Sequence, residues 1–381
     1  MNKSLPLEGI RILETALQFP GPYCCMLLAD LGAEVLKVER PGVGDPARHL
    51  PHWFSPINRN KKSLTLDLKA QAGREILYRL IESYDVFTEG SRPGVASRLG
   101  IDYETLSGRN PRLIYCSISG YGQDGPYRDL PGHDLNYQAM AGMLQFFKDG
   151  EGNFIAPGVP LGDISSAMFA ALSIMAALMA RDKTGQGQYV DVSMFDGLLS
   201  WISLHFGIFF GTGKTGMDMD AGYGIFQAAD GESFALGIAI EDWFWDRLCS
   251  ATGLDEYRGI QAKERRERKE ELVERLQAVF VQKPKEEWMR ILGEADVPVS
   301  PVHTLEEVVD DPHVLFRKMI QEMTLKSGEK VKQLSFPVKL SHTPANLRIP
   351  PPELGEHTGE VLESLYYSKD EIERFIKEGV V

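Results

Sequence analysis

A histidine and an aspartate stand side by side in Gly132-His133-Asp134, directly before an expected helix, LNYQAMAGML. Histidine is the side chain best suited to accept and return a proton near neutral pH. The alternative is structural, with Asp134 as a helix N-cap and His133 as an ordinary surface or core residue. The pair alone leaves both interpretations open.

Asp163 and Glu241 are two further acid/base candidates. Asp163 follows Leu161-Gly162 at the expected start of a long apolar helix. It is either an N-cap or, if its carboxylate faces a cleft, a base or a nucleophile, and Gly162 would let a ligand approach the backbone closely. Glu241 precedes an aromatic helix, DWFWDRL, and taken alone it indicates an acid that complements the helix dipole.

Basic residues recur in the first half of the chain, several of them after predicted strands, which is where α/β proteins bind ligands. In an acidic protein this pattern favours a diphosphate-bearing ligand, and the alternative is that these are ordinary surface residues. The residues concerned are Arg40, Lys61, Lys62, Lys69, Arg92 and Arg98.

The elements that would position these residues alternate between strand and helix. Parallel strands with helical crossovers indicate an α/β sheet, and the spacing fits a doubly wound, Rossmann-like arrangement. The first turn contains a loop, Phe19-Pro20-Gly21-Pro22, in place of GxGxxG, which disfavours a nicotinamide dehydrogenase. The patterns predict strands at 10–13, 35–38, 63–68, 86–88, 113–119 and 189–192, and helices at 23–31, 73–83 and 163–181.

A second unit is expected after a linker rich in Gly, Met and Asp at 211–221. The charge run at 262–277 indicates the solvated face of one helix. The other patterns predict strands at 234–236 and 297–302, a helix from 242 to 249, a helix that begins at Thr304, and a final helix at 370–377.

Composition limits the class of protein. The 381 residues suffice for two to three domains, and the net charge of −13 argues against a nucleic-acid partner. The four cysteines lack metal-ligand spacing, so we expect no metal site and a reducing, cytoplasmic location. No apolar run resembles a signal peptide or approaches the roughly eighteen residues of a membrane span, so no membrane partner is expected.

Several segments together resemble the class III CoA-transferase family, which includes the α-methylacyl-CoA racemases. They occur in the family's order over nearly the whole chain. The segments are LEGIRILE, FPGP, LADLGAEVLKVERPGVGDPAR, NRNKKSLTLDLK, EGSRPGVASRLGI, SISGYGQDGPY, GHDLNYQAMAG, LGDISSA, KTGQGQYVDVSMFD, AADGESFALG and FPVKLSHTPANLRIPPPELGEHTGEVL.

The resemblance implies a Rossmann-like large domain at 1–198 and 333–381 and a smaller α+β domain at 222–318. Linkers would lie at 199–221 and 319–332. It also implies a ring-shaped chain that forms an intertwined homodimer, with CoA on the large domain and the acyl end reaching the partner's small domain.

By position, the resemblance implies a set of CoA-contacting residues in the first hundred residues. The chain departs from the family at Phe19 and Pro20, and at Ser91, where an aromatic residue is usual, so the adenine contacts are expected to differ. The set is Arg40, Leu66, Asp67, Leu68, Lys69, Gly90, Ser91, Arg92 and Arg98.

The resemblance also implies roles for the acid/base candidates. Asp163 resembles the aspartate of the family's GD motif, a nucleophile in transferases and one of two bases in racemases. His133 matches the second base, in a GHD(I/L)NY motif, and Glu241 lies in the segment that pairs with that histidine. Together with Asp134, these residues point to the racemase branch. The glycine-rich loop of the transferases has no clear counterpart beyond Gly211-Thr212-Gly213.

The sequence therefore predicts a 2-methylacyl-CoA racemase that moves the α-proton between two bases, with the N–H of Asp134 or a neighbour stabilising the enolate. No cofactor is expected beyond the CoA moiety, because the thioester acidifies the α-carbon. The main alternative is a CoA-transferase that forms a thioester on Asp163, and a CoA-binding protein without turnover is a third. Residues that could line an acyl pocket, with core packing as the default, are Met140, Met143, Met168, Met194 and the aromatics from Trp243 to Trp245.

Overall fold

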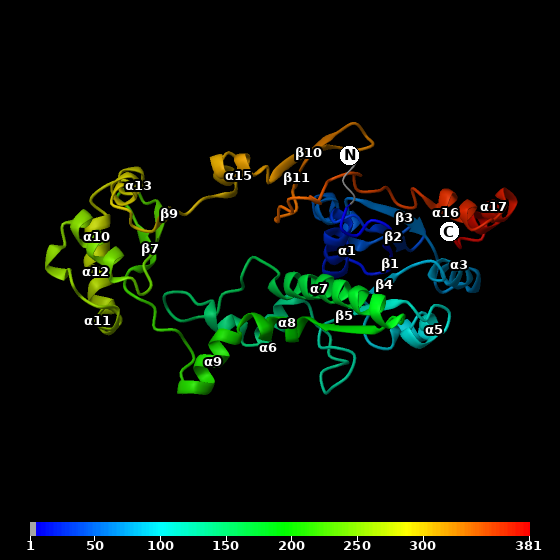
Figure 1. Cartoon of the computed structure of the whole chain (residues 1–381), viewed down its shortest axis with the longest axis horizontal. Helices are drawn as coiled ribbons and strands as arrows, with labels where there is room; N and C mark the ends of the chain where they lie inside the picture. Colours follow the sequence, from blue (N-terminus) through cyan, green and yellow to red (C-terminus); the bar gives the residue numbers. More distant parts are fainter. Residues whose placement is uncertain (1–4) are drawn as a thin grey trace. The chain divides into compact units, whose positions relative to one another are not determined.

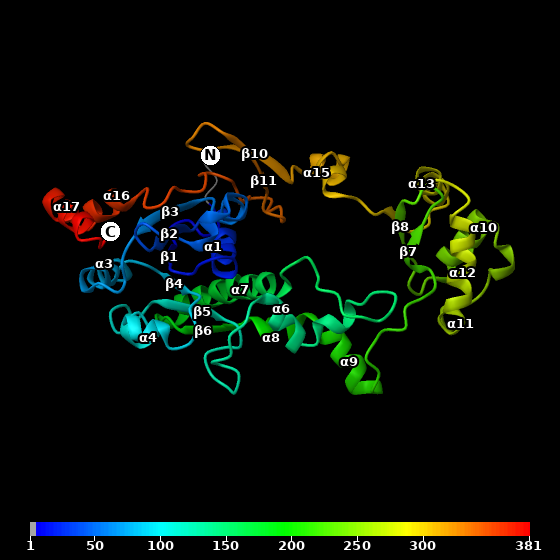
Figure 2. The same cartoon turned by 180° about the vertical axis from the view of Figure 1, so that it is seen from behind.

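The computed structural model describes residues 5–381, which form two compact units (Figures 1 and 2). The large unit runs to Ser203 and resumes at Arg317–Val381. The small unit is Leu204–Phe316. The large unit is therefore built from both ends of the chain.

A six-stranded parallel sheet forms the centre of the large unit. Its order, β3-β2-β1-β4-β5-β6, is that of the Rossmann fold, which confirms the predicted α/β class. Leu13 on the central strand pairs with Leu36 on one side and Phe87 on the other. The strands are β1 (Arg11–Glu14), β2 (Glu34–Glu39), β3 (Lys61–Thr65), β4 (Val86–Glu89), β5 (Ile114–Ser119) and β6 (Tyr189–Ser193).

Helices cover both faces of this sheet, because successive strand residues point to opposite faces. Ile12 belongs to a core formed with α1 and α7, and Leu13 to a core formed with α3, α16 and α17. These helices are α1 (Pro20–Asp30), α3 (Gln71–Ile81), α7 (Leu161–Thr184), α16 (Thr358–Ser364) and α17 (Lys369–Lys377).

Helix α1 begins at Pro20, so the prediction of a separate loop followed by a helix from Tyr23 is wrong. Pro20 and Pro22 lie in the first turn, where backbone N–H groups have no acceptor within the helix and proline is tolerated. Gly21 is required by packing, because a Cβ there would lie 2.1 Å from the Cβ of Ala16. The FPGP segment is thus the first turn of the helix.

By length and composition alone, α7 is apolar enough to cross a membrane, which differs from the expectation that no such segment exists. Helices α8 (Met194–Trp201) and α9 (Ser203–Thr212) meet the same criterion only as a pair bent by 63°. Ala167, Ala170 and Ile174 of α7 are fully buried in the core of the sheet. The core helix of a globular domain meets the same criterion of length and composition, and this is the packing of α7.

The free edge of β3 is covered by the C-terminal segment of the chain. The N–H of His357 donates to the carbonyl of Ser63 at 2.9 Å, and the N–H of Thr65 donates to Oγ1 of Thr358 at 3.1 Å. On either side of the strand, the N–H of Asn60 donates to Ile349 and the N–H of Asp67 donates to Val380. An uncovered edge strand would present a row of unpaired backbone groups. Residues about 290 to 310 positions later in the chain satisfy these groups here.

Buried ion pairs fix the loops that follow β1 and β2. The Nζ of Lys37 lies 2.9 Å from Glu14 Oε1 and 2.9 Å from Asp45 Oδ2, and all three side chains are fully buried. The second oxygen of Glu14 lies 2.8 Å from the Nζ of Lys61. Asp45 also accepts the N–H of Gln18 at 3.0 Å. Lys61 is therefore committed to Glu14, and its suggested part in binding an anionic ligand is wrong.

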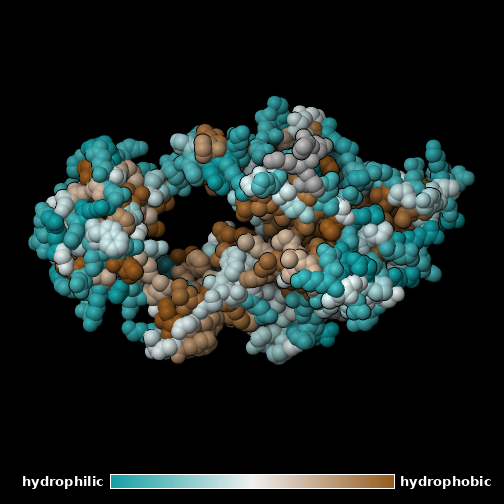
Figure 3. Space-filling view, in the orientation of Figure 1, coloured by the Kyte–Doolittle hydropathy of each residue, from teal (hydrophilic) through white to brown (hydrophobic). Residues whose placement is uncertain are grey.

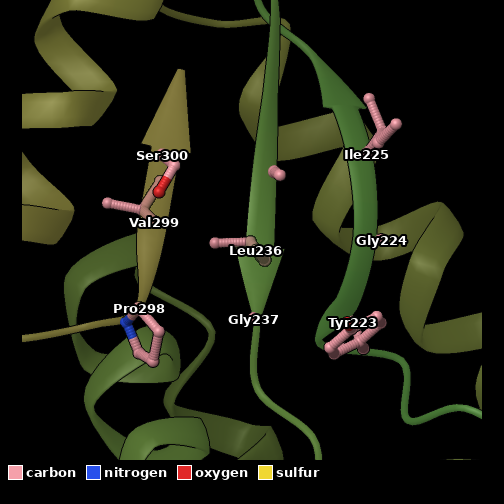
Figure 4. Close-up of a pocket in the computed structure, with 9 residues that line it drawn as sticks. Tyr223, Gly224, Ile225, Leu236, Gly237, Pro298, Val299 and Ser300 are labelled. Carbon is pink, nitrogen blue, oxygen red and sulfur yellow. The ribbon is translucent and has the colours of Figure 1, made fainter. Parts of the chain in front are cut away.

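The small unit is an α+β domain around an antiparallel sheet of order β7-β8-β9. Phe234, Phe280 and Trp288 form its aromatic core. Figure 4 shows residues from all three strands that line a cavity of about 350 Å³ on this sheet. The elements are β7 (Tyr223–Gln227), β8 (Ser233–Gly237), β9 (Val299–Pro301), α10 (Asp242–Thr252), α11 (Ala262–Glu267), α12 (Lys269–Phe280), α13 (Lys285–Glu294), α14 (Leu305–Val309) and α15 (Pro312–Arg317).

The single helix predicted at 262–277 is wrong, because the chain forms α11 and α12 with a break at Arg268. Arg265 is fully buried and its guanidinium lies 2.8 Å from Asp220 and 2.7 Å from Asp242. These two ion pairs fix the direction of α11. Helix α12 instead packs its apolar face against the aromatic core. A single straight helix could not make the ion pairs of Arg265 and this packing at the same time.

Two segments expected to be linkers contain regular structure. The range 319–332 contains β10 (Ile320–Thr324) and the start of β11 (Lys330–Leu334), which pair as an antiparallel hairpin. The range 199–221 contains α9. The alternation of polar and apolar residues in these two strands is too weak for the hairpin to be predicted from the sequence.

Candidate active site

The predicted CoA-contacting residues lie beyond the carboxyl ends of three neighbouring strands. Arg40 follows β2, residues 66–69 follow β3 and residues 90–92 follow β4. Arg98 lies on α4 (Val95–Leu99), which comes next along the chain. Open α/β sheets bind ligands at this edge, beside the point where the strand order reverses, here between β1 and β4. The fold therefore gathers the predicted set along one edge of one sheet.

Four cations of this set are free to bind an anion. Arg40, Lys69, Arg92 and Arg98 are exposed, and none forms an ion pair with another of residues 5–381. Leu66 is different, because its side chain is buried in the core and only its backbone could meet a ligand. Exposed, unpaired cations along one edge suit a ligand that carries several phosphates.

The acid/base candidates of the large unit meet where α6 (Asp134–Met140) approaches the start of α7. Asp134 Oδ1 accepts the N–H of Gly162 at 2.7 Å and the N–H of Asp163 at 3.1 Å. Asp134 thus caps α7 rather than its own helix, whose N-cap is the exposed residue His133. This capping interaction brings His133, Asp134 and Asp163 to one junction.

Asp163 has the electrostatic character of a proton carrier. It lies in the first turn of α7, whose N-cap is Pro160, so its interpretation as an N-cap is wrong. Its half-buried carboxylate accepts no hydrogen bond from the described residues, 5–381. Burial, and then the negative charge of Asp134, raise the pKa of Asp163 to about 7. Both protonation states are therefore populated near neutral pH, as a general base or acid requires.

Gln138 and Tyr137 hold this junction together and were not predicted from the sequence. The buried amide of Gln138 donates to Asp134 Oδ2 and, at 3.4 Å, to the carbonyl of Val159. The hydroxyl of Tyr137 donates to the carbonyl of Gly132 at 2.6 Å. The i, i+4 spacing of Asp134 and Gln138 on a helix is the signal that could have identified Gln138.

Tyr137 also links the acid/base junction to the cationic edge of the sheet. Burial raises the pKa of its hydroxyl, the charges of Tyr121 and Asp163 raise it further, and Arg92 lowers it. A group that responds to both Asp163 and Arg92 lies within electrostatic reach of each. The predicted CoA edge and the acid/base pair therefore belong to one region of the large unit.

Glu241 lies in the small unit, at the N-cap of α10. Its Oε2 accepts the N–H groups of Ala239 and Ile240, each at 3.0 Å. These hydrogen bonds, with the N–H of Glu241 itself, lower the pKa of the carboxyl, so the group stays ionised and fixed in orientation. The pairing of Glu241 with His133 stays a prediction.

The four cysteines, two of them Cys116 and Cys249, are free thiols and all are buried. Burial raises the pKa of Cys249 to about 12 and that of Cys116 well above its ordinary value, so these two are not nucleophilic thiolates at neutral pH. Among residues 5–381, no group of three or more His, Cys, Asp and Glu side chains is arranged to hold a metal ion.

Comparison with known protein families settles which family the chain represents. The model of CoA-transferase family III matches residues 7–358. The chain belongs to this family. The predicted family is thereby confirmed, and the protein is an acyl-CoA-handling enzyme.

Relatives of this family III enzyme carry the names of two different reactions. Human alpha-methylacyl-CoA racemase is 36% identical over 391 residues, which cover 99% of this chain and 98% of that protein. Mouse succinyl-CoA:glutarate CoA-transferase is 32% identical over 397 residues, which cover 99% of this chain and 90% of that protein. The crystal structure of a CAIB/BAIF family protein from Brucella suis matches with a TM-score of 0.85 at 28% identity, covering 95% of this chain and 100% of that one. Family membership thus leaves the reaction to be decided by the site.

Proposed function

We propose that this family III enzyme is a 2-methylacyl-CoA racemase that exchanges the α-proton of a CoA thioester between His133 and Asp163. The observation that carries the proposal is the junction at which Asp134, the neighbour of His133 in the chain, accepts the N–H of Asp163 at 3.1 Å. Burial and the charge of Asp134 raise the pKa of Asp163 there to about 7. A proton carrier must gain and lose its proton near neutral pH, whereas a carboxylate nucleophile works best when it is always ionised. The identity with the human racemase supports the same branch.

The proposed reaction uses only groups of the chain and the thioester itself. The phosphates of CoA lie along the edge that carries Arg40, Lys69 and the neighbouring arginines, and the α-carbon lies between the two bases. His133 takes the α-proton, the C–H electron pair moves to the thioester oxygen, and the enolate then takes a proton from Asp163 on the opposite face. The N–H of Asp134 at the start of α6 stabilises the enolate oxygen. Turnover in the reverse direction restores both bases.

The proposal also assigns roles to Asp134 and Glu241, and it requires neither a metal ion nor an organic cofactor. Asp134 positions Asp163 through the backbone and raises its pKa, and Glu241 of the small unit orients His133. No metal ion or organic cofactor takes part beyond the CoA moiety, because the thioester is already an electron acceptor for the α-carbanion. The free, buried thiols suit a reducing, cytoplasmic location.

We also propose that the enzyme works as a homodimer. Large apolar side chains are exposed on α9, namely Leu204, Phe209 and Phe210, and Figure 3 shows hydrophobic atoms gathered over that helix. Met168 and Leu172 of α7 are exposed as well. Apolar surface of this extent is stabilised when a second copy covers it. Light scattering coupled to gel filtration tests this, and a monomer at micromolar concentration would contradict it.

The decisive experiment follows the α-proton of one 2-methylacyl-CoA epimer by NMR in D₂O, with no carboxylate acceptor present. Loss of the α-proton signal with appearance of the other epimer is expected. The variant His133→Ala should abolish the exchange and keep CoA binding, and His313→Ala, at an exposed histidine of α15, is the matched control. Full racemisation by the His133 variant would refute the two-base assignment.

A CoA-transferase is the second candidate, favoured by the carboxylate of Asp163, which accepts no hydrogen bond from residues 5–381 and is open to a thioester carbonyl. Several relatives also carry transferase names. In this reaction the Asp163 carboxylate attacks the thioester carbonyl, which releases CoA thiolate and leaves an acyl-aspartyl anhydride. The thiolate then attacks the aspartyl carbonyl, which gives an aspartyl-CoA thioester and releases the acyl group as a free carboxylate. Hydroxylamine trapping followed by mass spectrometry of the peptide that contains Asp163 distinguishes the two, because a racemase forms no such adduct.

A further inference from the structure

An apolar cavity of about 500 Å³ lies in the large unit, a volume typical of small-molecule sites. Phe19, Leu50, Trp53 and Pro160 are among its eight lining residues. All of the lining side chains are apolar except that of His52, and none is a lysine or an arginine.

The cavity adjoins the acid/base junction through Pro160. Pro160 is the N-cap of α7, and Asp163 follows in the first turn of that helix. On another side the cavity is bounded by Phe19, the N-cap of α1, whose ring meets the edge of Trp53 with a centroid distance of 6.4 Å. The cavity thus begins within one helical turn of the carboxylate that the thioester must reach.

Two of the lining side chains are exposed although they are apolar. Leu50 is 59% exposed and Trp53 is 47% exposed. Covering them with another apolar group is favourable, because burial removes their surface from water. The cavity is therefore suited to an apolar occupant.

The cations on either side of this segment are already paired. Arg48 makes two bonds of 2.7 Å to the carboxylate of Glu39, and Arg59 lies 2.7 Å from Asp30. Neither guanidinium is free to receive a second carboxylate. An acyl group that ends in a carboxylate would thus lose its hydration in the cavity, where no lysine or arginine lines the wall and His52 is the one polar lining side chain.

We infer that this cavity receives the acyl group of the CoA thioester and selects an apolar acyl group over one that ends in a carboxylate. The inference rests on the proposed function only in taking a CoA thioester as the ligand, and it holds for either reaction. It separates this enzyme from the relatives named for succinate and glutarate. It also places the acyl group against Leu50 and Trp53, whereas the sequence offers four methionines as candidates for an acyl pocket, with core packing as their default.

The test on the unaltered protein is calorimetric binding of CoA, acetyl-CoA, butyryl-CoA and succinyl-CoA. Each buried methylene contributes about 0.8 kcal/mol, or about a fourfold gain in affinity, so butyryl-CoA should bind at least tenfold more tightly than acetyl-CoA. Butyryl-CoA and succinyl-CoA have acyl chains of equal length, and the second should bind at least about tenfold more weakly. Equal affinities across the series would overturn the inference.

The variant Leu50→Arg tests the location. It should weaken butyryl-CoA at least about fivefold, strengthen succinyl-CoA, and leave CoA itself within twofold. Leu305→Arg, at a leucine of the small unit that is 82% exposed, is the control and should change none of these affinities. An unchanged ratio of butyryl-CoA to succinyl-CoA affinity in the Leu50 variant would assign the cavity to another occupant, such as a second copy of the chain.

The two proposals fail in different ways. These binding measurements involve no turnover, so a protein that shows the acyl preference but no α-proton exchange refutes only the racemase. A protein that binds CoA and exchanges the α-proton without any acyl preference refutes only the acyl cavity.

Discussion

Replacing Asp163 with asparagine should stabilise the protein, by an amount that depends on pH. Burial and the charge of Asp134 raise the pKa of this carboxyl from its ordinary 3.8 to about 7 in the folded chain. Between these two values the unfolded chain is ionised at this position while the folded chain keeps the proton. Ionisation therefore stabilises the unfolded state and not the folded state. The free energy of unfolding falls as the pH rises from 3.8 to about 7.

The size of the effect follows from the two pKa values. Each pKa unit corresponds to 1.36 kcal/mol, so a rise from 3.8 to about 7 lowers the free energy of unfolding by about 4 kcal/mol above pH 7. At pH 5.5 the loss is about 2 kcal/mol, and below pH 3.8 it vanishes. Asparagine has nearly the same shape and no charge to desolvate, so the Asp163→Asn variant avoids this loss.

Urea unfolding of the wild type and the variant, at one protein concentration and at pH 5.5 and 7.5, measures the difference. The variant should be more stable by about 2 kcal/mol at the lower pH and by about 4 kcal/mol at the higher. Asp182→Asn, at an exposed aspartate near the other end of α7, is the matched control and should show no such pH dependence. A gain for Asp163→Asn that is the same at both pH values, or a variant that is less stable, would refute the electrostatic account.

Three further perturbations test other parts of the molecule. Asp134→Asn removes one of the two causes that raise the pKa of Asp163. The change in kcat/KM near pH 7 that the ionisation of Asp163 produces should therefore move to lower pH, in profiles measured from pH 5 to 9. Gln138→Leu removes a hydrogen bond that holds the Asp134 carboxylate and should lower kcat/KM for α-proton exchange by about 10- to 100-fold. The same part of the pH profile, near pH 7, should be displaced, and CoA affinity should be retained. Lys37→Met leaves the buried carboxylate of Asp45 without its cation and Glu14 with Lys61 as its one remaining cation, so it should lower the free energy of unfolding by about 3–5 kcal/mol. Lys62→Met, at an exposed ion pair, should change it by less than about 1 kcal/mol in the same urea titration.

The parts of the fold that local sequence determines were predictable. Strands β1, β2 and β5 are short apolar runs between turn residues, and α7 is a long apolar helix ending at Gly185, so the α/β order follows from pattern alone. The break at Arg268 was not predictable, because it depends on the buried partners of Arg265, one of which lies 45 residues away. The same holds for Lys61, which looks like a surface lysine until Glu14 is placed beside it.

The candidate site divides in the same way. The residues His133, Asp134 and Asp163 stand out by type and by the motifs that contain them. Their relationship does not, because the hydrogen bonds from Gly162 and Asp163 to Asp134 span 28 and 29 residues. The sequence therefore identifies the acid/base groups. Only the tertiary packing shows that the carboxylate of Asp134 binds the start of α7 and raises the pKa of Asp163.

The C-terminal cover on the edge of β3 has a consequence for synthesis on the ribosome. Strand β3 leaves the exit tunnel early, but the residues that pair with its edge, His357 and Thr358, are translated much later. At 5–20 residues per second, roughly 300 intervening residues take on the order of 15–60 s. During that interval the edge of β3 is open to any neighbouring nascent chain, so crowding on a polysome, or deletion of the segment that contains His357 and Thr358, should favour aggregation at this strand.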